Sequence, residues 1–481
     1  MHNFKKNRRG SNLLICILLL GCDGDDNKNE PKTESGAEFC SDKIDNDGDG
    51  ATDCVDAECS AFCKCDPNAV LDEEVLSLPR LRVDLSDQFR PVTHAASGSL
   101  YGLGEEGMPS DDLIGPLKPF MFTQMAPGGR QRTVGDALEV APIAERAGAT
   151  VMIRMPDIYS GFPYAWVDFD DWLEKVETIV ADTTASGATN IYGYEIWNEP
   201  DWTWPSDAEP FFDVWKATFD KIREADRETD IVGPSIASWN KLWMRQFFEF
   251  AIENDCMPDI VCWHELGEPE GSYVDDPKPE FIPEHSADYR SLEEELGVGP
   301  LPITINEYGV QTEEGVPGGM VRYIAHFERE NIESANMAFW YAAGRLSDLV
   351  TRDGRANGGW WFYKFYGDLS GQMAMSYREP DVSVDLDGIG AVDAETETVS
   401  VIFGGAKGDR AIVIEGFDTL PFFSCRAEVT AEHTPWEGKD GAVSKPDVLF
   451  REEYQIIDGI LAVPITDMNE DSGYRLVITP L

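Results

Sequence analysis

The stretch Gly193-Tyr194-Glu195-Ile196-Trp197-Asn198-Glu199-Pro200 is an apolar, strand-like run that ends in an Asn-Glu pair. The stretch Ile303-Thr304-Ile305-Asn306-Glu307-Tyr308-Gly309 repeats this pattern more than a hundred residues later. In a barrel of alternating strands and helices, functional side chains lie at the carboxyl ends of the strands. Glu199 and Glu307 are therefore predicted to face each other at one end of such a barrel.

Strand-like and helix-like segments alternate over residues 97–368, which favours this fold. The helix-like segments have apolar residues that recur at intervals of three and four, so each has one apolar face. The strands are expected at 100–105, 119–124, 150–155, 191–197, 231–235, 259–264, 302–307 and 334–340, and the helices at 135–147, 169–187, 209–229, 240–256, 286–296 and 317–330. The alternation predicts an α/β fold, a (β/α)8 TIM barrel, with Glu199 after the fourth strand and Glu307 at the end of the seventh.

Two carboxyl groups that face each other can cleave a glycosidic bond with retention of configuration. One protonates the leaving oxygen and the other attacks the sugar. Taken alone, Glu199 could be a carboxylate in the first turn of a helix capped by Asn198. The second Asn-Glu at a matching position makes a glycosidase, EC 3.2.1.-, the better interpretation. The sequence has no Gly-rich phosphate loop and no Gly-x-Ser-x-Gly motif, and its six histidines lack metal-ligand spacing, so no cofactor is expected for catalysis.

The paired motifs resemble those of clan A glycoside hydrolases. Trp-Asn-Glu-Pro at 197–200 with Asn-Glu-Tyr at 306–308 most resembles glycoside hydrolase family 39, over roughly residues 97–368. This resemblance implies a retaining enzyme with Glu199 as acid/base and Glu307 as nucleophile. The family includes xylosidases, iduronidases, arabinose-releasing enzymes and exopolysaccharide hydrolases. The substrate is therefore expected to be an oligo- or polysaccharide. The resemblance does not identify which sugar is released.

Other residues near the predicted strand ends are candidates for substrate binding. Asn198 is expected to hydrogen-bond the 2-hydroxyl of the sugar, a contact that strengthens in the transition state. His264 ends the sixth strand and is expected beside Glu307, although a hydrogen-bonded core histidine is the alternative. Trp340 ends the eighth strand and is expected under the sugar, unless it packs at the barrel rim. The substrate-binding candidates are Asn198, His264, Trp340 and Tyr308, with Tyr159, Trp202, Trp204 and Gln131 as looser ones.

Two further pairs lie near the barrel strands. Arg154 and Glu195 point into the barrel or the cleft and are expected to form a buried ion pair. Cys256 and Cys262 flank the start of the sixth strand, where they form either a disulfide or a pair of buried thiols.

Short alternating runs after Gly367 predict an accessory β-sandwich over residues 369–481. Residues 66–96, before the barrel, are expected to add strands to this sandwich. Such a domain could bind carbohydrate, but a role in stabilising the barrel is favoured.

The amino-terminal residues predict export. A basic start precedes the apolar stretch from Leu13 to Leu20, which is too short to span a bilayer as a mature anchor. Leu19-Leu20-Gly21-Cys22 resembles a lipobox, so residues 1–21 are interpreted as a lipoprotein signal peptide, with an ordinary signal peptide as the alternative. Lipid on Cys22 would anchor the protein to a bacterial membrane or cell surface. Residues 22–39 are polar and are predicted to be a flexible linker.

Residues 40–65 combine five cysteines with an aspartate-rich loop. If Asp45 is position one of a twelve-residue loop, then Gly50 is position six, where calcium loops turn sharply. The predicted calcium ligands are Asp45, Asp47, Asp49, Asp53 and Asp56. Cysteines flank the loop in place of helices, which resembles the disulfide-bounded calcium repeats of exported bacterial proteins. The calcium in residues 45–56 would be structural, and an acidic linker is the alternative.

Charge limits the partners of the protein. The chain has 481 residues, a formal net charge of −50 and a pI near 4.3. Such a surface repels nucleic acid, which excludes that class of partner. Two rival functions remain: a catalytically silent carbohydrate-binding or adhesion lipoprotein, and a polysaccharide lyase. The intact pair of glutamates argues against the first, and nothing in the sequence demands the cation that the second often uses.

Overall fold

A computed structural model describes residues 44–45, 48, 50, 59, 69–267, 279–338, 342–378 and 386–481. The chain divides into two compact units, Met1–Cys63 and Lys64–Leu481. The predictions for Cys22, Asp47, Asp49, Asp53, Asp56 and Trp340 lie outside the described residues. No helix in the described ranges is both long and apolar enough to cross a membrane.

Within the first unit, Asp45 is described. Its carboxylate accepts hydrogen bonds from the backbone N–H groups of Gly48, at 2.6 Å, and Gly50, at 3.0 Å. Both glycines have positive φ angles, which glycine adopts without a Cβ clash. Asp45 therefore closes a local turn at the first position of the predicted calcium loop.

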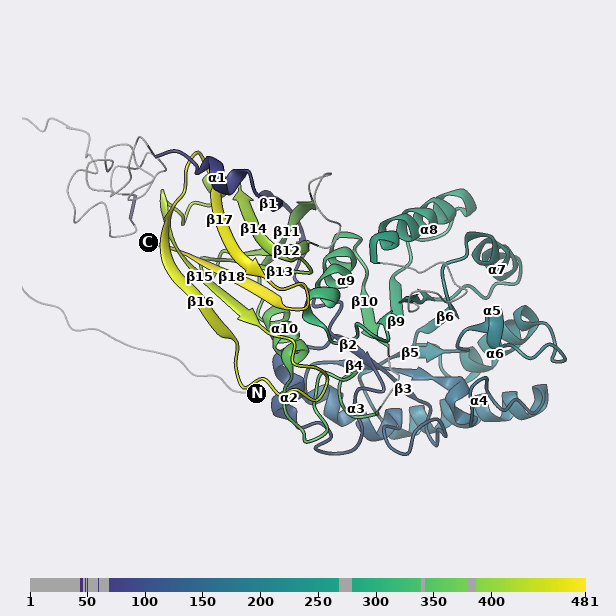
Figure 1. The fold of residues 1–481 in the computed structure, drawn as a ribbon. Coiled ribbons are helices and arrows are strands. Elements are labelled where there is room, and N and C mark those ends of the chain that lie inside the picture. Colours follow the sequence, from purple (N-terminus) through teal and green to yellow (C-terminus); the bar gives the residue numbers. More distant parts are fainter. Residues whose placement is uncertain are drawn as a thin grey trace, which may run out of the picture. The chain divides into compact units, whose positions relative to one another are not determined.

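Eight parallel strands close into a barrel in the second unit (Figure 1). They are β2 (Gly98–Leu100), β3 (Met121–Met125), β4 (Thr150–Arg154), β5 (Ile191–Glu195), β6 (Ile231–Ile236), β7 (Ile260–Trp263), β9 (Ile303–Val310) and β10 (Ser334–Met337). Pairing of β10 with both β2 and β9 closes the ring, and the short β8 (Glu265–Gly267) pairs with the end of β9. The predicted TIM barrel is confirmed, and each predicted strand overlaps an observed one.

The helices that follow these strands also lie where the periodicity placed them. They are α3 (Ala137–Arg146), α4 (Phe169–Ser186), α6 (Phe211–Ala225), α7 (Lys241–Glu253), α8 (Ile282–Leu296) and α9 (Pro317–Arg329). The first turn of α4 is capped by Asp168, whose side chain accepts the N–H of Asp171, and the helix ends at Gly187 in a left-handed conformation. A further helix, α10 (Gly358–Gly367), was not predicted, because its buried aromatic sequence has no polar face to reveal the helical period.

The remaining strands form a β-sheet domain. Its strands are β1 (Arg80–Pro91), β11 (Gln372–Arg378), β12 (Asp387–Asp393), β13 (Thr398–Gly404), β14 (Gly408–Glu415), β15 (Arg426–Thr434), β16 (Asp447–Gln455), β17 (Leu461–Met468) and β18 (Gly473–Pro480). They are hydrogen-bonded in one sheet of nine strands, so the accessory β-domain predicted after the barrel is present. As expected, β1 joins this domain, between β11 and β14, but Glu73–Leu76 before it is a short helix, α1.

The sheet domain packs against the barrel through α9 and α10 (Figure 1). Arg329 of α9 donates a hydrogen bond of 2.7 Å to Asp387 of β12, which is fully buried. The connection between β15 and β16 reaches the loops after β9 and β10, where Lys439 lies 3.7 Å from Glu314 and 3.3 Å from Asp348. The sheet domain thus helps to hold loops at the carboxyl end of the barrel strands.

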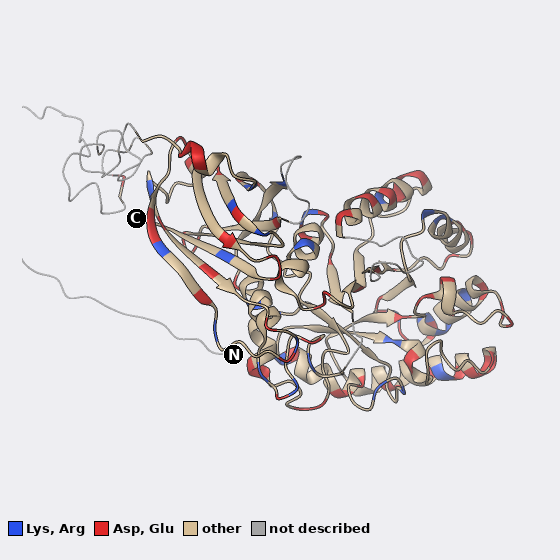
Figure 2. Cartoon of the chain, in the orientation of Figure 1, with Lys and Arg blue, Asp and Glu red and all other residues tan. Residues whose placement is uncertain are grey.

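Acidic side chains are spread over the outer helices and the sheet domain (Figure 2).

Candidate active site

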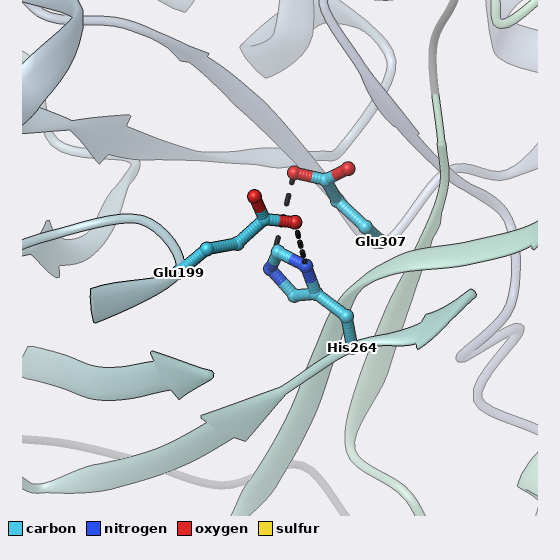
Figure 3. Close-up of side chains that lie close together, drawn as sticks. All are labelled: Glu199, His264 and Glu307. Carbon is cyan, nitrogen blue, oxygen red and sulfur yellow. Dashed lines mark hydrogen bonds and ion pairs between the residues drawn. The ribbon is translucent and has the colours of Figure 1, made fainter. Parts of the chain in front are cut away.

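The barrel brings the two predicted glutamates together with His264 between them (Figure 3). Nδ1 of His264 lies 3.1 Å from Oε1 of Glu199, and its Nε2 lies 3.8 Å from Oε1 of Glu307. One oxygen of each glutamate and one nitrogen of the imidazole all lie within 4.8 Å of one another. The strand ends therefore create a compact acidic centre, with the histidine at the position expected from the sequence.

Glu307 lies within β9, where the pairing with β10 shifts register. The guanidinium of Arg154, at the end of β4, donates a hydrogen bond of 2.6 Å from Nη1 to Oε1 of Glu307. Nε of Arg154 donates to Oε2 of Glu195 at 2.6 Å, and Asn306 donates to the other oxygen of Glu195 at 2.6 Å. The expected ion pair between Arg154 and Glu195 is confirmed, and it extends to Glu307.

This network controls the ionisation of Glu307. Burial raises the pKa of a carboxyl group, but the charges of His264 and Arg154 outweigh burial and lower the pKa of Glu307 below its ordinary value. For Arg154, burial acts to lower the pKa, but the charges of Glu195 and Glu307 raise it well above the ordinary value. Glu307 is thus an ionised carboxylate whose Oε1 is held in place. In the described part of the chain, no residue donates a hydrogen bond to its Oε2.

Glu199 lies on a tight turn beyond the end of β5. Its backbone is left-handed, with φ 57° and ψ 52°, and its N–H donates to the carbonyl of Ser235 at 2.8 Å. Oγ1 of Thr203 lies 2.8 Å from the carbonyl oxygens of both Asn198 and Glu199, and it accepts a hydrogen bond of 3.0 Å from the indole of Trp197. A left-handed glutamate costs about 1–2 kcal/mol, so the surrounding contacts must hold this turn.

The side chain of Glu199 has a partner on each oxygen. Its Oε1 faces His264, and its Oε2 accepts a hydrogen bond of 2.9 Å from the indole N–H of Trp202. Burial lowers the pKa of His264, but the charge of Glu307 and the hydrogen bond to Glu199 outweigh burial and raise it above the ordinary value. A protonated His264 would be a donor to Glu199.

Asn198 precedes Glu199 and is only 2% exposed. Its Oδ1 is buried and has no hydrogen-bond partner among the described residues. An unpaired buried polar atom is costly, and a ligand hydroxyl beside the glutamates could supply the missing donor. This placement suits the predicted contact with a sugar.

The same three side chains could also bind a cation, because a carboxylate oxygen from each of Glu199 and Glu307 and an imidazole nitrogen of His264 are close enough to share one. However, Nδ1 of His264 is already paired with Glu199, and the charge of Arg154 lies on Glu307. A second positive charge there would be repelled by the guanidinium.

Sequence reasoning missed a further buried acid, Asp157. It lies three residues after Arg154 and accepts hydrogen bonds from the hydroxyls of Tyr101, at 2.6 Å, and Tyr164, at 3.3 Å. Burial, which outweighs the charge of Arg154, raises the pKa of Asp157 to about 7. The signal in the sequence that could have identified Asp157 is its position as a polar residue just after a predicted strand.

Tyr308 is a wrong prediction for substrate binding. It is fully buried, and its hydroxyl bonds the carbonyl of Ala96 at 2.8 Å and the hydroxyl of Tyr363 at 2.6 Å. Its ring packs against Tyr323 and Phe327 of α9. Glu307 bonds Arg154 inside the barrel, whereas the ring of Tyr308 faces α9.

The looser candidates also differ in whether they contact the site. Gln131 donates to the carbonyls of Tyr159 and Gly161, and the hydroxyl of Tyr159 donates to Asp171, so both hold loops. Trp204 packs edge-on against Trp197, while Trp202 reaches the site.

Cys256 and Cys262 are free, buried thiols, which settles the alternative left open by the sequence. The thiol of Cys262 donates to Oδ1 of Asn306 at 2.8 Å. Burial raises the pKa of Cys256 to about 11, so this thiol is unreactive.

Comparison with known proteins gives matches that agree with this site. Residues 168–311 match the model of glycosyl hydrolases family 39. The chain is 28% identical to 3-O-alpha-D-galactosyl-alpha-L-arabinofuranosidase of Bifidobacterium longum subsp. longum, over 85% of this chain and 41% of that protein. It is 26% identical to 3-O-beta-L-arabinopyranosyl-alpha-L-arabinofuranosidase of Bifidobacterium pseudocatenulatum, over 86% of this chain and 49% of that protein. The chain thus spans less than half the length of these relatives.

A solved structure, that of N2152 from Neocallimastix frontalis, is similar to most of this chain. The two chains are 35% identical and superpose with a TM-score of 0.78, and the match covers 84% of this chain and 100% of that one. This similarity spans both the barrel and the sheet domain. The family match within the barrel and the names of the curated relatives together support a glycoside hydrolase.

Proposed function

We propose that the protein is a retaining glycosidase that acts by double displacement, with Glu307 as nucleophile and Glu199 as acid/base. The observation that carries this proposal is the contrast between the two carboxyl groups. The charges of His264 and Arg154 hold Glu307 ionised, whereas Glu199 contacts no arginine or lysine among the described residues and accepts a hydrogen bond from Trp202. One oxygen of each carboxyl group lies within 4.8 Å of the other, so the two groups are close enough to act on the same sugar.

In the first step, Oε2 of Glu307 attacks the anomeric carbon while Glu199 gives its proton to the leaving oxygen. The bond from the sugar to that oxygen breaks, and a glycosyl ester to Glu307 forms. Arg154 keeps the other oxygen of Glu307 fixed, and this orients Oε2 toward the anomeric carbon. The unpaired Oδ1 of Asn198 accepts a hydrogen bond from the sugar hydroxyl next to the anomeric carbon.

In the second step, Glu199 is a carboxylate and acts as a base. It takes a proton from a water molecule, which attacks the anomeric carbon and releases Glu307. His264 contacts both glutamates, so it can donate to Glu199 when that group is ionised. The two inversions together retain the configuration of the sugar.

The proposed substrate class is α-L-arabinofuranosides. Both curated relatives are named for activity on a substituted α-L-arabinofuranosyl linkage, and their similarity to this chain covers the barrel and the sheet domain. The substituent on the arabinose differs between those two names, so the sugar beyond it is left open.

A panel of 4-nitrophenyl glycosides tests this proposal. The wild-type protein should hydrolyse the α-L-arabinofuranoside faster than the β-D-xyloside or the β-D-glucoside. Glu307→Gln, which keeps the shape of the side chain, should be inactive on all of them. Activity of Glu307→Gln equal to that of the wild type would refute the assigned nucleophile, whereas preference for another sugar would refute only the substrate.

The same proposal includes export with a lipid on Cys22 and structural calcium in residues 45–56. Its support is the Leu-Leu-Gly-Cys motif and the spacing of the aspartates. Labelling of the wild type with radioactive palmitate, and no labelling of Cys22→Ser, is the expected result. Equal labelling of both proteins would contradict the anchor.

A further inference from the structure

Two exposed aromatic rings lie side by side next to Glu199. Trp202 of α5 (Pro200–Thr203) is 55% exposed, and Phe162, in the loop between β4 and α4, is 52% exposed. Their ring centroids are 5.4 Å apart and the rings are nearly perpendicular, at 80°. Since these loops follow neighbouring barrel strands, the two rings form one aromatic wall at the carboxyl end of the barrel.

Both rings are fixed, although half of each is in water. The indole N–H of Trp202 donates to Oε2 of Glu199 at 2.9 Å, so the exposed ring is tied to a buried carboxyl group. Phe162 packs edge-on against the buried Tyr164, with centroids 5.6 Å apart, and the hydroxyl of Tyr164 donates to Asp157. Single exposed aromatic residues are common, but two fixed rings at the rim of an acidic centre suit ligand binding.

Their position relative to Glu199 selects the part of the substrate that they meet. An acid/base must contact the leaving oxygen, so the leaving group lies on the side of the cleft next to Glu199. Glu307, which meets the other face of the sugar, has no aromatic partner of this kind in the described ranges. Sugars present C–H faces that pack well on aromatic rings.

We propose that Trp202, supported by Phe162, binds the ring of the leaving-group sugar. This inference rests on the proposed function, because it takes Glu199 as the acid/base. Trp202 then has two separable parts: the ring is a substrate contact, and the indole N–H positions the carboxyl group of Glu199. The wall thereby selects glycosides whose leaving group is a sugar over those with a small leaving group.

Two substrates with one glycone test the role of the ring. 1,5-α-L-arabinobiose has a sugar as its leaving group, and methyl α-L-arabinofuranoside has none, so the ratio of their kcat/KM values reports the leaving-group contact alone. Trp202→Ala should lower this ratio about fivefold to tenfold, the size of one aromatic contact. Trp202→Phe keeps a ring but loses the N–H, so it should lower both kcat/KM values and leave their ratio within about twofold.

Further variants control for folding and for the loss of an indole. Phe162→Leu, which removes no hydrogen bond, should lower the ratio about twofold. Trp361 lies on α10, far from Trp202 in the sequence, and its indole N–H donates to the carbonyl of Val443. Trp361→Phe loses this hydrogen bond and should change neither kcat/KM value. If the wild type prefers another glycone, the same pair of substrates is made with that sugar. The wild type therefore tests the arabinofuranoside assignment, and the variants test the role of Trp202.

Three results would overturn the proposal. An unchanged ratio in Trp202→Ala would mean that Trp202 acts only through Glu199. An equal fall of the ratio in Trp202→Phe and Trp202→Ala would assign the preference to the N–H and not to the ring. A wild type without activity on any glycoside would remove both this inference and the proposed function.

Discussion

Glu199 and Glu307 end equivalent Asn-Glu motifs, yet the barrel holds them in opposite ways. Glu307 lies within β9, where the pairing with β10 is irregular, and it is paired with Arg154. Glu199 lies beyond β5 on a left-handed turn, beside the exposed Trp202. The pairing with Arg154 suits a carboxylate that must stay ionised, whereas a carboxyl group that contacts no arginine or lysine among the described residues suits a group that must exchange protons with substrate and water.

The difference shows that burial alone does not set the role of a carboxyl group. Asp157 and Glu307 are both buried near Arg154, but the pKa of Asp157 is raised to about 7, chiefly by burial, and that of Glu307 is lowered. Glu307 accepts a hydrogen bond from the guanidinium and faces His264, whereas the partners of the Asp157 carboxyl group among the described residues are two tyrosine hydroxyls. A direct cationic partner decides which of the two stays charged at neutral pH.

The largest effect is expected for Glu307→Ala. Without the nucleophile, kcat should fall by about 10⁴-fold or more on every substrate. Added azide should restore turnover by attacking from the vacated side, so the glycosyl azide formed has inverted configuration. NMR of that product is the measurement, and an azide product of retained configuration would assign the nucleophile to another residue.

Glu199→Ala should lose activity selectively. We expect a fall of about 10²–10⁴-fold for 1,5-α-L-arabinobiose, whose leaving sugar needs a proton, and a much smaller fall for the 2,4-dinitrophenyl glycoside. Azide should here trap the intermediate on Glu307 and give a product of retained configuration. Glu174→Ala, an exposed glutamate on α4, is the matched control. An equal loss of activity on both substrates would contradict the assignment of different roles to the two glutamates.

Arg154→Lys should weaken the pairing that keeps Glu307 ionised. Because the pKa of Glu307 is lowered in the folded protein, its carboxylate persists above that pKa and is lost as the pH falls through it. The variant should raise this pKa, so the acidic limb of the kcat/KM profile moves to higher pH, by about one pH unit. Arg245→Lys, at an exposed ion pair with Glu295, controls for the substitution. An unmoved acidic limb would show that Arg154 does not set the ionisation of Glu307.

The sequence was sufficient for what depends on local pattern. The barrel strands and the placement of Glu199, Glu307 and His264 followed from apolar runs with polar ends. The hydrogen bond from Trp202 to Glu199 was not predictable, because it depends on a left-handed turn that no propensity suggests for glutamate.

The sheet domain was predicted less completely. Alternating runs located its strands, but the strand order, which places β1 between β11 and β14, is set by contacts far apart in sequence. The aromatic helix α10 was missed because most of its side chains are apolar and buried, so its sequence shows no polar face.

Chelation should have the smallest effect. With EDTA, turnover should stay within about 1.5-fold of the untreated protein, because two carboxyl groups complete the reaction without a metal. Residues 40–65 should become sensitive to protease in the same sample if they bind structural calcium. Loss of turnover that calcium or zinc restores would instead place a cation at Glu199, His264 and Glu307.

Stereochemistry of the product tests the central claim most directly. Free arabinose loses its configuration in water, so the reaction is run in aqueous methanol, where the sugar is trapped as a stable methyl glycoside. Proton NMR should show that the first product from 4-nitrophenyl α-L-arabinofuranoside is methyl α-L-arabinofuranoside, as expected for attack by Glu307 followed by attack of methanol. Formation of the β-anomer would contradict double displacement and show that a single direct attack takes place between the two glutamates.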